Sequence, residues 1–324
     1  MKKTRILLTT TSFQDTPGEH HKLLAETGWE IVAARGPLNE ANTLALMGEF
    51  DGYICGDDLI TAAVIEKALP RLKVVSKYGI GVDKIDVKTL TAKGIPLLFT
   101  PGVNHTTVAE HTFLLLLALE KNFYFHTDST RSGGWKRKTG RELLDKTIGI
   151  IGMGRIGQGI AKRAAHGFGM RVIYHNRSRL SADLEAACKA TYVSKEELLR
   201  TADHVMLVVP YSAESHHTIG AKELGSMKPS ATLVNIARGG IVDDVALAVA
   251  LKNKQIAAAG LDVFEAEPAL NPALLTVPNV VLTPHIASST VKTRLAMAQL
   301  AADNLVSFFA TGKALTPLNQ VTSK

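Results

Sequence analysis

The sequence has few of the features that cross-link a chain or anchor it in a membrane. It contains two cysteines, Cys55 and Cys188, far apart in 324 residues. This scarcity argues against a disulfide framework and a cysteine-built metal centre, and it favours a reducing, cytoplasmic location. The longest apolar run, residues 113–119, is far shorter than the ~20 residues that cross a bilayer. The basic start leads into a short apolar run and then a polar turn, so we expect no signal peptide and no membrane span.

Internal repeats and low-complexity tracts are also missing, and the composition is ordinary. Hydrophobic residues make up 46% and charged residues 21%, which is typical of a globular chain and argues against a disordered or fibrous one. The length predicts about two domains. The net charge of +7 favours an anionic partner. The one basic cluster, 131–146, contains a single aromatic residue, Trp135, so we interpret it as a solvated loop and expect no nucleic-acid binding.

Short β-type runs alternate with amphipathic stretches, a pattern typical of parallel sheets covered by helices. The predicted strands of the first hundred residues are 5–9, 30–33, 52–55, 74–76 and 96–99. A long buried helix is predicted at 104–122, followed by strands at 147–151, 171–175, 204–209, 232–235, 258–261 and 280–282. The last stretch, 290–310, has helical spacing, and we expect it to pack on the sheet of the first series.

A glycine-rich turn connects the strand at 147–151 to a predicted helix at 158–167. Gly152, Gly154 and Gly157 form the pattern G-x-G-x-x-G. In a strand–turn–helix unit, the first glycine allows the tight turn, the second lets the backbone approach a pyrophosphate, and the third lets the helix lie close to the strand. The N-terminus of the helix favours the negative charge of the phosphates. The pattern therefore predicts a dinucleotide site.

The end of the next strand indicates which dinucleotide binds. An NAD site usually carries an acidic residue there to hold the ribose 2′-hydroxyl. This chain has Asn176 at that place, followed by Arg177, Ser178 and Arg179. The arginines and the serine hydroxyl suit a 2′-phosphate. We therefore expect NADP as cofactor, with NADPH preferred and NAD possible.

Three consecutive strand ends in the second half carry the chemistry that reduction of a 2-oxo acid requires. Such a reaction needs a cation for the substrate carboxylate and an acid that protonates the carbonyl oxygen. Arg238, Glu267 and His285 follow the strands at 232–235, 258–261 and 280–282. A carboxylate such as Glu267 would fix the tautomer of His285 and favour its protonated form. Each residue alone has an ordinary structural explanation, but together they predict a catalytic site.

These motifs resemble the D-isomer-specific 2-hydroxyacid dehydrogenase family over nearly the whole chain. The similarity is carried by the glycine turn and by the segments 235–244 and 260–268. It implies that Arg238 binds the substrate carboxylate and carbonyl, that His285 is the acid and base, and that Glu267 pairs with His285. The other cofactor contacts that it implies are Thr107, Arg155, Ile156, Val209, Pro210, Ile236, Ala237 and Asp262.

A second loop resembles the substrate-carboxylate loop of the same family. It comprises Lys77, Tyr78, Gly79, Ile80 and Gly81. The two glycines free backbone N–H groups that can surround an anion. The lysine could add a positive charge for a phosphorylated or hydroxylated substrate.

The expected architecture is α/β, with two Rossmann-like parallel-sheet domains. The substrate domain is predicted to be flavodoxin-like and discontinuous, comprising 1–102 and 290–324, and the dinucleotide-binding domain comprises 103–289. The resemblance also implies a homodimer, with the helix from Asn104 and an arm at 131–141 as its contacts. Trp135 on that arm could reach the partner's active site or anchor the arm.

The expected function is hydride transfer between NAD(P)H and a small anionic 2-oxo or D-2-hydroxy acid. Reduction of glyoxylate and hydroxypyruvate is the leading interpretation, and we expect no metal in the reaction. A 3-phosphoglycerate or 2-ketogluconate-type dehydrogenase remains an alternative. A non-catalytic, corepressor-like protein that senses NAD(P)H is a third reading.

Overall fold

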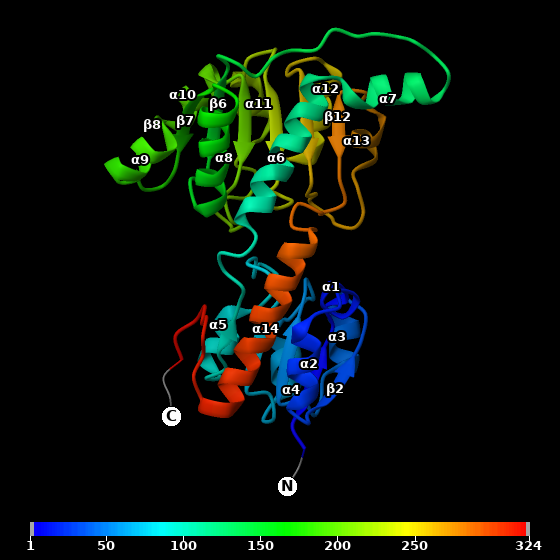
Figure 1. Cartoon of the computed structure of the whole chain (residues 1–324), viewed down its shortest axis with the longest axis vertical. Helices are drawn as coiled ribbons and strands as arrows, with labels where there is room; N and C mark the ends of the chain where they lie inside the picture. The colour runs from blue at the N-terminus through cyan, green and yellow to red at the C-terminus, as the bar shows by residue number, and fades with distance from the viewer. Residues whose placement is uncertain (1–2, 322–324) are drawn as a thin grey trace. The chain divides into compact units, whose positions relative to one another are not determined.

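The computed structural model describes residues 3–321, which form two compact units (Figure 1). Unit 1 comprises Met1–Asn104 and Ser289–Lys324, and unit 2 comprises His105–Ser288. Each unit is built on one parallel sheet, so the predicted α/β class with two parallel sheets is confirmed. No helix of the described residues is long and apolar enough to cross a membrane.

Unit 1 has a five-stranded parallel sheet in the order β2-β1-β3-β4-β5. Its strands are β1 (Arg5–Leu8), β2 (Glu30–Ala33), β3 (Gly52–Cys55), β4 (Val74–Lys77) and β5 (Leu97–Leu98). The central strands β3 and β4 are buried along their whole length, because helices cover both faces of a parallel sheet. That is why β3 reads as a nearly continuous apolar run rather than as an alternating one.

The helices of unit 1 are α1 (Thr11–Asp15), α2 (Glu19–Glu26), α3 (Glu40–Leu46), α4 (Ala62–Ala68), α5 (Val87–Ala92) and α14 (Val291–Thr311). The last of these comes from the far end of the chain. Its small residues Ala298 and Ala302 lie in one buried cluster with Ile6 and Leu8 of β1. The predicted packing of the final helix on the first sheet is therefore confirmed. Gly312 ends α14 with a φ of 73°, the left-handed conformation typical of a helix C-terminus.

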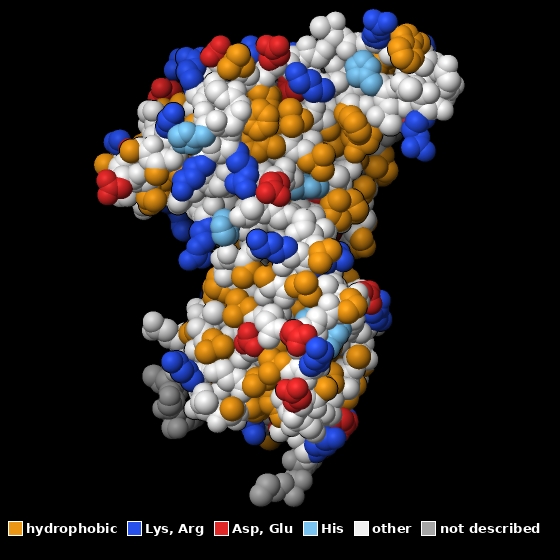
Figure 2. All heavy atoms as spheres, in the orientation of Figure 1, with side chains coloured by type: hydrophobic (Ala, Val, Ile, Leu, Met, Phe, Trp, Pro, Cys, Tyr) orange, Lys and Arg blue, Asp and Glu red, His pale blue; other side chains and the backbone are white. Residues whose placement is uncertain are grey.

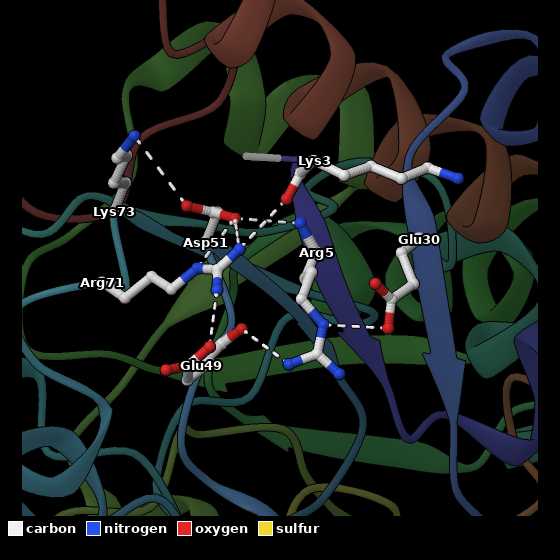
Figure 3. Close-up of polar contacts among 7 residues, drawn as sticks. All are labelled: Lys3, Arg5, Glu30, Glu49, Asp51, Arg71 and Lys73. Atoms are coloured by element: carbon white, nitrogen blue, oxygen red, sulfur yellow. Dashed lines mark hydrogen bonds and ion pairs between the residues drawn. The ribbon is translucent and has the colours of Figure 1, made fainter. Parts of the chain in front are cut away.

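A network of charged side chains closes the amino ends of the strands of unit 1 (Figure 3). Asp51 accepts hydrogen bonds from the backbone N–H of Arg5 at 2.9 Å and from Nη2 of Arg71 at 2.9 Å. Arg5 also pairs with Glu30 at 2.9 Å. The network joins β1 and β2 to the residues that precede β3 and β4, so it stabilises the edge of the sheet opposite to the strand carboxyl ends.

Unit 2 has a seven-stranded parallel sheet in the order β12-β11-β10-β9-β6-β7-β8. Its strands are β6 (Thr147–Ile151), β7 (Arg171–His175), β8 (Ala190–Tyr192), β9 (His204–Leu207), β10 (Thr232–Asn235), β11 (Ala258–Leu261) and β12 (Val280–Leu282). The sequence prediction missed only β8 among them. This strand is a three-residue edge strand that pairs with β7, too short for a periodic signal.

The helices of unit 2 are α6 (His105–Glu120), α7 (Phe123–Arg131), α8 (Arg155–Gly167), α9 (Ala182–Cys188), α10 (Lys195–Thr201), α11 (Ala221–Ser226), α12 (Asp244–Lys252) and α13 (Pro272–Thr276). The predicted long helix is α6. Its residues Phe113, Leu115 and Leu116 are buried in one cluster with Ile148 and Ile150 of β6. Figure 1 shows α6 and α8 on the same face of the sheet.

One part of unit 2 lies outside its core. Helix α7 has no buried residue, and residues 134–142 after it carry no regular structure and are followed by the buried Leu143. We call residues 123–142 the arm. It exposes several aromatic side chains, among them Phe123 and Trp135, the second of which is 77% exposed. Figure 2 shows hydrophobic side chains at the surface in the region of α6 and α7.

Candidate active site

The glycine turn has the geometry of a phosphate cradle. β6 runs directly into the turn, and α8 begins at Arg155 with Gly154 as its N-cap. Gly152 has a φ of 102°, and a Cβ there would lie 2.6 Å from the carbonyl oxygen of Val208. A Cβ on Gly157 would collide with the carbonyl oxygen of Gly152. These two positions require glycine for the fold itself.

Gly154 lacks a side chain for a different reason. Nothing in the protein lies within 4 Å of a Cβ built there, so an alanine would fit the fold. The space lies at the N-terminus of α8, where unpaired backbone N–H groups and the helix dipole favour an anion. The chain therefore fits a pyrophosphate that approaches the backbone at this glycine.

The predicted cofactor residues lie at one edge of the sheet. β7, β6, β9, β10 and β11 are successive neighbours, and all are parallel, so their carboxyl ends lie together. The predicted contacts that follow these ends are Gly152, Gly154, Arg155, Ile156 and Gly157 after β6, Asn176, Arg177 and Ser178 after β7, Val209 and Pro210 after β9, Ile236 and Ala237 after β10, and Asp262 after β11. Thr107 lies instead on α6, where it is buried.

The turn after β7 connects to the glycine turn. The side-chain oxygen of Asn176 lies 3.5 Å from the backbone N–H of Met153, and its amide nitrogen donates to the carbonyl oxygen of Ser178 at 3.0 Å. Arg177 and Ser178 are exposed. Hydrogen bonds to Ser212 and to its own backbone, together with the charge of Arg177, lower the pKa of Glu214. The positive charge of Arg177 thus acts on the loop that follows β9.

The catalytic pair that the sequence predicts is formed. Nδ1 of His285 lies 2.9 Å from Oε2 of Glu267, and the other oxygen of Glu267 accepts from the backbone N–H of Phe264 at 2.8 Å. The His285 and Glu267 side chains are 33% and 25% exposed, so substrate can reach the pair. His285 has a φ of 52°, which is unusual for a non-glycine residue, and its N–H donates to the carbonyl oxygen of Asp262. The loop is thus held in a specific conformation.

The loop that carries Arg238 packs directly on the loop that carries Glu267. A Cβ on Gly239 would collide with the carbonyl oxygen of Phe264, so the two backbones touch. The Asn235 side chain ties the arginine loop together by donating to the carbonyl oxygen of Arg238 at 3.0 Å. The ends of β10, β11 and β12 therefore bring the guanidinium loop and the imidazole–carboxylate pair to one edge of the sheet.

The Asp262 carboxylate holds the backbone of the loop that carries His285. Its carboxylate is fully buried and accepts hydrogen bonds from the Thr283 hydroxyl at 2.7 Å and from the backbone N–H groups of Ile286 and Ala287 at 2.9 and 2.8 Å. Nε2 of His111, on α6, lies 3.3 Å from the same carboxylate. Burial by itself would raise the pKa of Asp262, but these partners lower it below its usual value.

The predicted substrate loop lies in unit 1, at the end of β4. Lys77 is only 3% exposed, and its Nζ lies 2.6 Å from Oδ1 of Asp57. Gly79 has a φ of 125°, and its N–H donates to the Thr100 hydroxyl at 2.9 Å. Burial raises the pKa of Tyr78 to about 12. The loop is therefore fixed by its own unit, with Ile80 exposed at its tip.

Comparisons with known proteins identify the family. Residues 113–287 match the family model described as D-isomer specific 2-hydroxyacid dehydrogenase, NAD binding domain. The chain is also 48% identical, over 258 residues, to a glyoxylate reductase of Pyrococcus furiosus, and the match covers 77% of this chain and 76% of that one. The chain belongs to the D-isomer-specific 2-hydroxyacid dehydrogenase family.

Two further relatives extend the match. A glyoxylate/hydroxypyruvate reductase B of Escherichia coli is 39% identical over 281 residues, covering 85% of this chain and 86% of that one. The crystal structure of an NADPH-dependent glyoxylate/hydroxypyruvate reductase from Sinorhizobium meliloti, in complex with NADP and malonate, aligns with a TM-score of 0.82 and 32% identity, covering 98% and 97% of the two chains. The predicted oxidoreductase class and the dinucleotide-binding unit are thus confirmed at the level of the family.

The sequence prediction missed several polar contacts beside the predicted site residues. His111 sits in a largely apolar helix, and nothing in the local sequence indicates its partner, Asp262, 151 positions away. Glu185 on α9 and Tyr174 on β7 are a further pair, joined by a hydrogen bond of 2.7 Å. A polar side chain on the buried face of a predicted helix or strand was the only signal available for any of them.

The described residues contain one group that could hold a metal ion, formed by His216, His217 and Glu265. The two imidazole rings stack at 3.8 Å, and Nε2 of His217 lies 3.1 Å from a carboxylate oxygen of Glu265. A hydrogen-bonded cluster accounts for this arrangement without an ion.

Proposed function

We propose that the chain is an NADPH-preferring reductase of glyoxylate and hydroxypyruvate. The observation that carries the proposal is the hydrogen bond between Glu267 and His285, beside the Arg238 loop and at the same sheet edge as the glycine turn. The relatives described above carry names of this activity, which supports the substrate class.

The protein's own groups have distinct tasks in this reaction. When bound, the nicotinamide supplies a hydride to the keto carbon. The Arg238 guanidinium binds the substrate carboxylate and stabilises the negative charge that develops on the carbonyl oxygen. His285 donates the proton that completes the hydroxyl group, and Glu267 holds Nδ1 and stabilises the imidazolium before that transfer. One hydride and one proton thus convert the 2-oxo acid to the 2-hydroxy acid.

The cofactor preference is supported by charge. Asn176 brings no carboxylate to the ribose, and Arg177 and Ser178 are exposed at the turn beside it. A carboxylate there would bind the 2′-hydroxyl of NADH and repel a 2′-phosphate, whereas these residues suit the phosphate. The other contacts proposed for the cofactor are those named at the five strand ends and Thr107.

In the proposed division of labour, unit 2 binds the dinucleotide, and unit 1 contributes the loop from Lys77 to Gly81 for the substrate carboxylate. The ion pair between Lys77 and Asp57 weighs against a phosphorylated substrate, because the ammonium charge of the buried lysine is already paired with a carboxylate. A smaller anion such as glyoxylate needs no second cation from this loop. The alternative of 3-phosphoglycerate oxidation is therefore less favoured.

The proposal also includes a homodimer and a cytoplasmic location. The arm exposes Phe123, Tyr124, Phe125 and Trp135, an apolar surface that a second copy would cover. Both cysteines, Cys55 and Cys188, are buried and unbonded, which suits a reducing compartment.

A panel of 2-oxo acids tested with both nicotinamides checks the function. We expect loss of NADPH absorbance with glyoxylate and hydroxypyruvate, and a lower kcat/KM with NADH. If 3-phosphoglycerate or 2-ketogluconate were turned over with a higher kcat/KM than glyoxylate and hydroxypyruvate, that compound would be the substrate instead. Binding of NADPH without turnover of any acid would favour the sensing protein.

A further inference from the structure

A carboxylate on α9 holds the arginine that follows the cofactor-selecting turn. Nε and Nη2 of Arg179 donate to the two oxygens of Glu185 at 2.9 and 2.8 Å. Such a two-point contact between planar groups is strong and directional. The Glu185 side chain is 12% exposed, whereas that of Arg179 is 65% exposed, so the arginine comes from the solvent side to a nearly buried acid.

The same carboxylate is tied to the strand that leads into the turn. The Tyr174 hydroxyl donates to Oε1 of Glu185 at 2.7 Å and accepts from the backbone N–H of Leu180 at 2.8 Å. Tyr174 is fully buried in β7, two residues before Asn176. Glu185 thus connects the end of β7, the chain just after the turn and α9. We call Tyr174, Arg179 and Glu185 the clamp.

The clamp encloses the three residues that are proposed to face the ribose. Asn176, Arg177 and Ser178 lie between Tyr174 and Arg179, and both ends of this six-residue span are fixed to one carboxylate. A third contact braces the span from β8, since the Tyr192 hydroxyl lies 3.4 Å from the carbonyl oxygen of Asn176. The turn itself is exposed, so without the clamp its conformation would depend on few contacts of its own.

The carboxylate of the clamp is ionised at neutral pH. Hydrogen bonds from Arg179 and Tyr174 lower the pKa of Glu185 to about 2. The charge of Arg179 is consequently engaged within the protein. Turning its guanidinium toward a phosphate would break two charge-assisted hydrogen bonds and leave the Glu185 carboxylate with one.

We propose that Glu185 is a positioning residue for cofactor selection, which holds the turn so that Arg177 and Ser178 face the 2′-phosphate of NADPH. This inference rests on the proposed NADPH preference. Arg179 then acts as the partner of Glu185 and not as a phosphate ligand. The alternative arrangement predicts the opposite effect of Glu185 on NADPH affinity. If Arg179 bound the phosphate, Glu185 would compete for the guanidinium and weaken NADPH binding.

A double-mutant cycle separates these arrangements. The variants are Glu185→Gln, Arg179→Gln and the double variant, and the readout is the Kd of NADPH and of NADH, measured by nicotinamide fluorescence without a 2-oxo acid. We expect each single change to weaken NADPH binding by about tenfold, to leave NADH binding within about twofold, and the double change to be no worse than either single one. Asp183→Asn removes the same charge from an exposed site on the same helix and should leave both constants unchanged.

Each other outcome has a defined meaning. Tighter NADPH binding by Glu185→Gln, with weaker binding by Arg179→Gln, would overturn the inference and make Arg179 the ligand. Equal losses for NADPH and NADH would reduce the clamp to a structural role and also overturn it. Wild-type protein that binds NADH as tightly as NADPH would refute the proposed preference itself, a result visible before any variant is made.

Discussion

The proposed chemistry depends on the two nitrogens of one imidazole ring. Nδ1 of His285 is bound to Glu267, so Nε2 is the nitrogen that exchanges a proton with substrate. The ring is positioned from the backbone side as well, because its own N–H and the two following N–H groups are bound to Asp262. The orientation of this side chain is therefore set by two carboxylates, one at the ring and one at the loop.

Replacing the imidazole tests this arrangement. His285→Ala should lower kcat by about 10²- to 10⁴-fold, since it removes the proton donor. Glu267→Gln should lower kcat less, and it should cause no further loss in the His285→Ala background, because both residues act through one proton transfer. Steady-state kinetics with glyoxylate measures both effects, and NADPH affinity by fluorescence serves as the control. Near-normal turnover of His285→Ala would contradict the assignment.

At the scale of secondary-structure elements, the junction of β6 and α8 separates the needs of the fold from those of the ligand. Gly157 lets α8 lie against the turn, whereas Gly154 leaves open space at the helix N-terminus. Two glycines three residues apart are thus required for different physical reasons.

Alanine at each position should give opposite results. Gly157→Ala should lower the free energy of unfolding by about 1 to 3 kcal/mol, because its methyl group collides with backbone that cannot move away. Gly154→Ala should leave the thermal midpoint unchanged but weaken NADPH binding by about tenfold or more, since the methyl group occupies the place of the pyrophosphate. Thermal unfolding and fluorescence titration of the two variants provide the test. A stable Gly154→Ala variant that binds NADPH normally would place the phosphates elsewhere.

The charged network at the other end of the unit 1 strands concerns stability rather than chemistry (Figure 3). Although burial by itself would raise the pKa of Asp51, hydrogen bonds from Arg71 and from the backbone N–H of Arg5 lower it below the usual value. Because the pKa is lowered in the folded state, the ionised carboxylate stabilises the fold at pH values above the usual pKa of aspartate. That contribution is lost as the pH falls through the folded-state pKa.

Asp51→Asn should therefore destabilise unit 1 by about 1 to 3 kcal/mol at pH 7. The difference from the parent protein should shrink below about pH 4, where this carboxyl group binds a proton in the unfolded parent, and disappear below the lowered pKa of the folded state. Urea unfolding followed by Trp29 fluorescence in a Trp135→Phe background reports on unit 1 alone. Glu30→Gln is the matched control, since its half-exposed pair with Arg5 should contribute less than about 1 kcal/mol. A pH-independent difference would contradict the role of the charge.

At the scale of the whole molecule, the arm is the part of the chain that a single copy leaves uncovered. Helix α7 has no buried residue, and the exposed aromatic side chains of the arm form more apolar surface than a loop connection requires. A second copy of the chain would bury this surface, which is the physical basis of the proposed homodimer.

Light scattering should give about twice the 34.8 kDa mass of one chain. Phe123→Asp on the arm should shift the mass towards one chain, because it places a charge in the proposed interface. Leu275→Asp is a control, because Leu275 is 59% exposed and Phe123 56%, but Leu275 lies on α13 and outside the arm. A parent protein with the mass of one chain would refute the dimer.

Much of the fold and the central site follows from local sequence alone. Buried parallel strands are short apolar runs, so the sequence predicts them directly. The glycine pattern between a strand and a helix predicts a dinucleotide-binding turn in the same way. Arg238, Glu267 and His285 could be predicted as neighbours because each lies in a loop that follows a strand, and parallel strands end at the same edge. β8 was missed because a three-residue edge strand has no periodicity to detect.

Contacts between distant positions were decided only by the tertiary structure. The sequence places Arg179 beside a cofactor turn, but folding turns it to Glu185 on a separate helix. Likewise, His111 meets Asp262, and Lys77 meets Asp57, through packing that no local pattern encodes. Backbone conformation depends on neighbouring residues, whereas the partner of a charged side chain depends on which elements come together, and that is settled when the core packs.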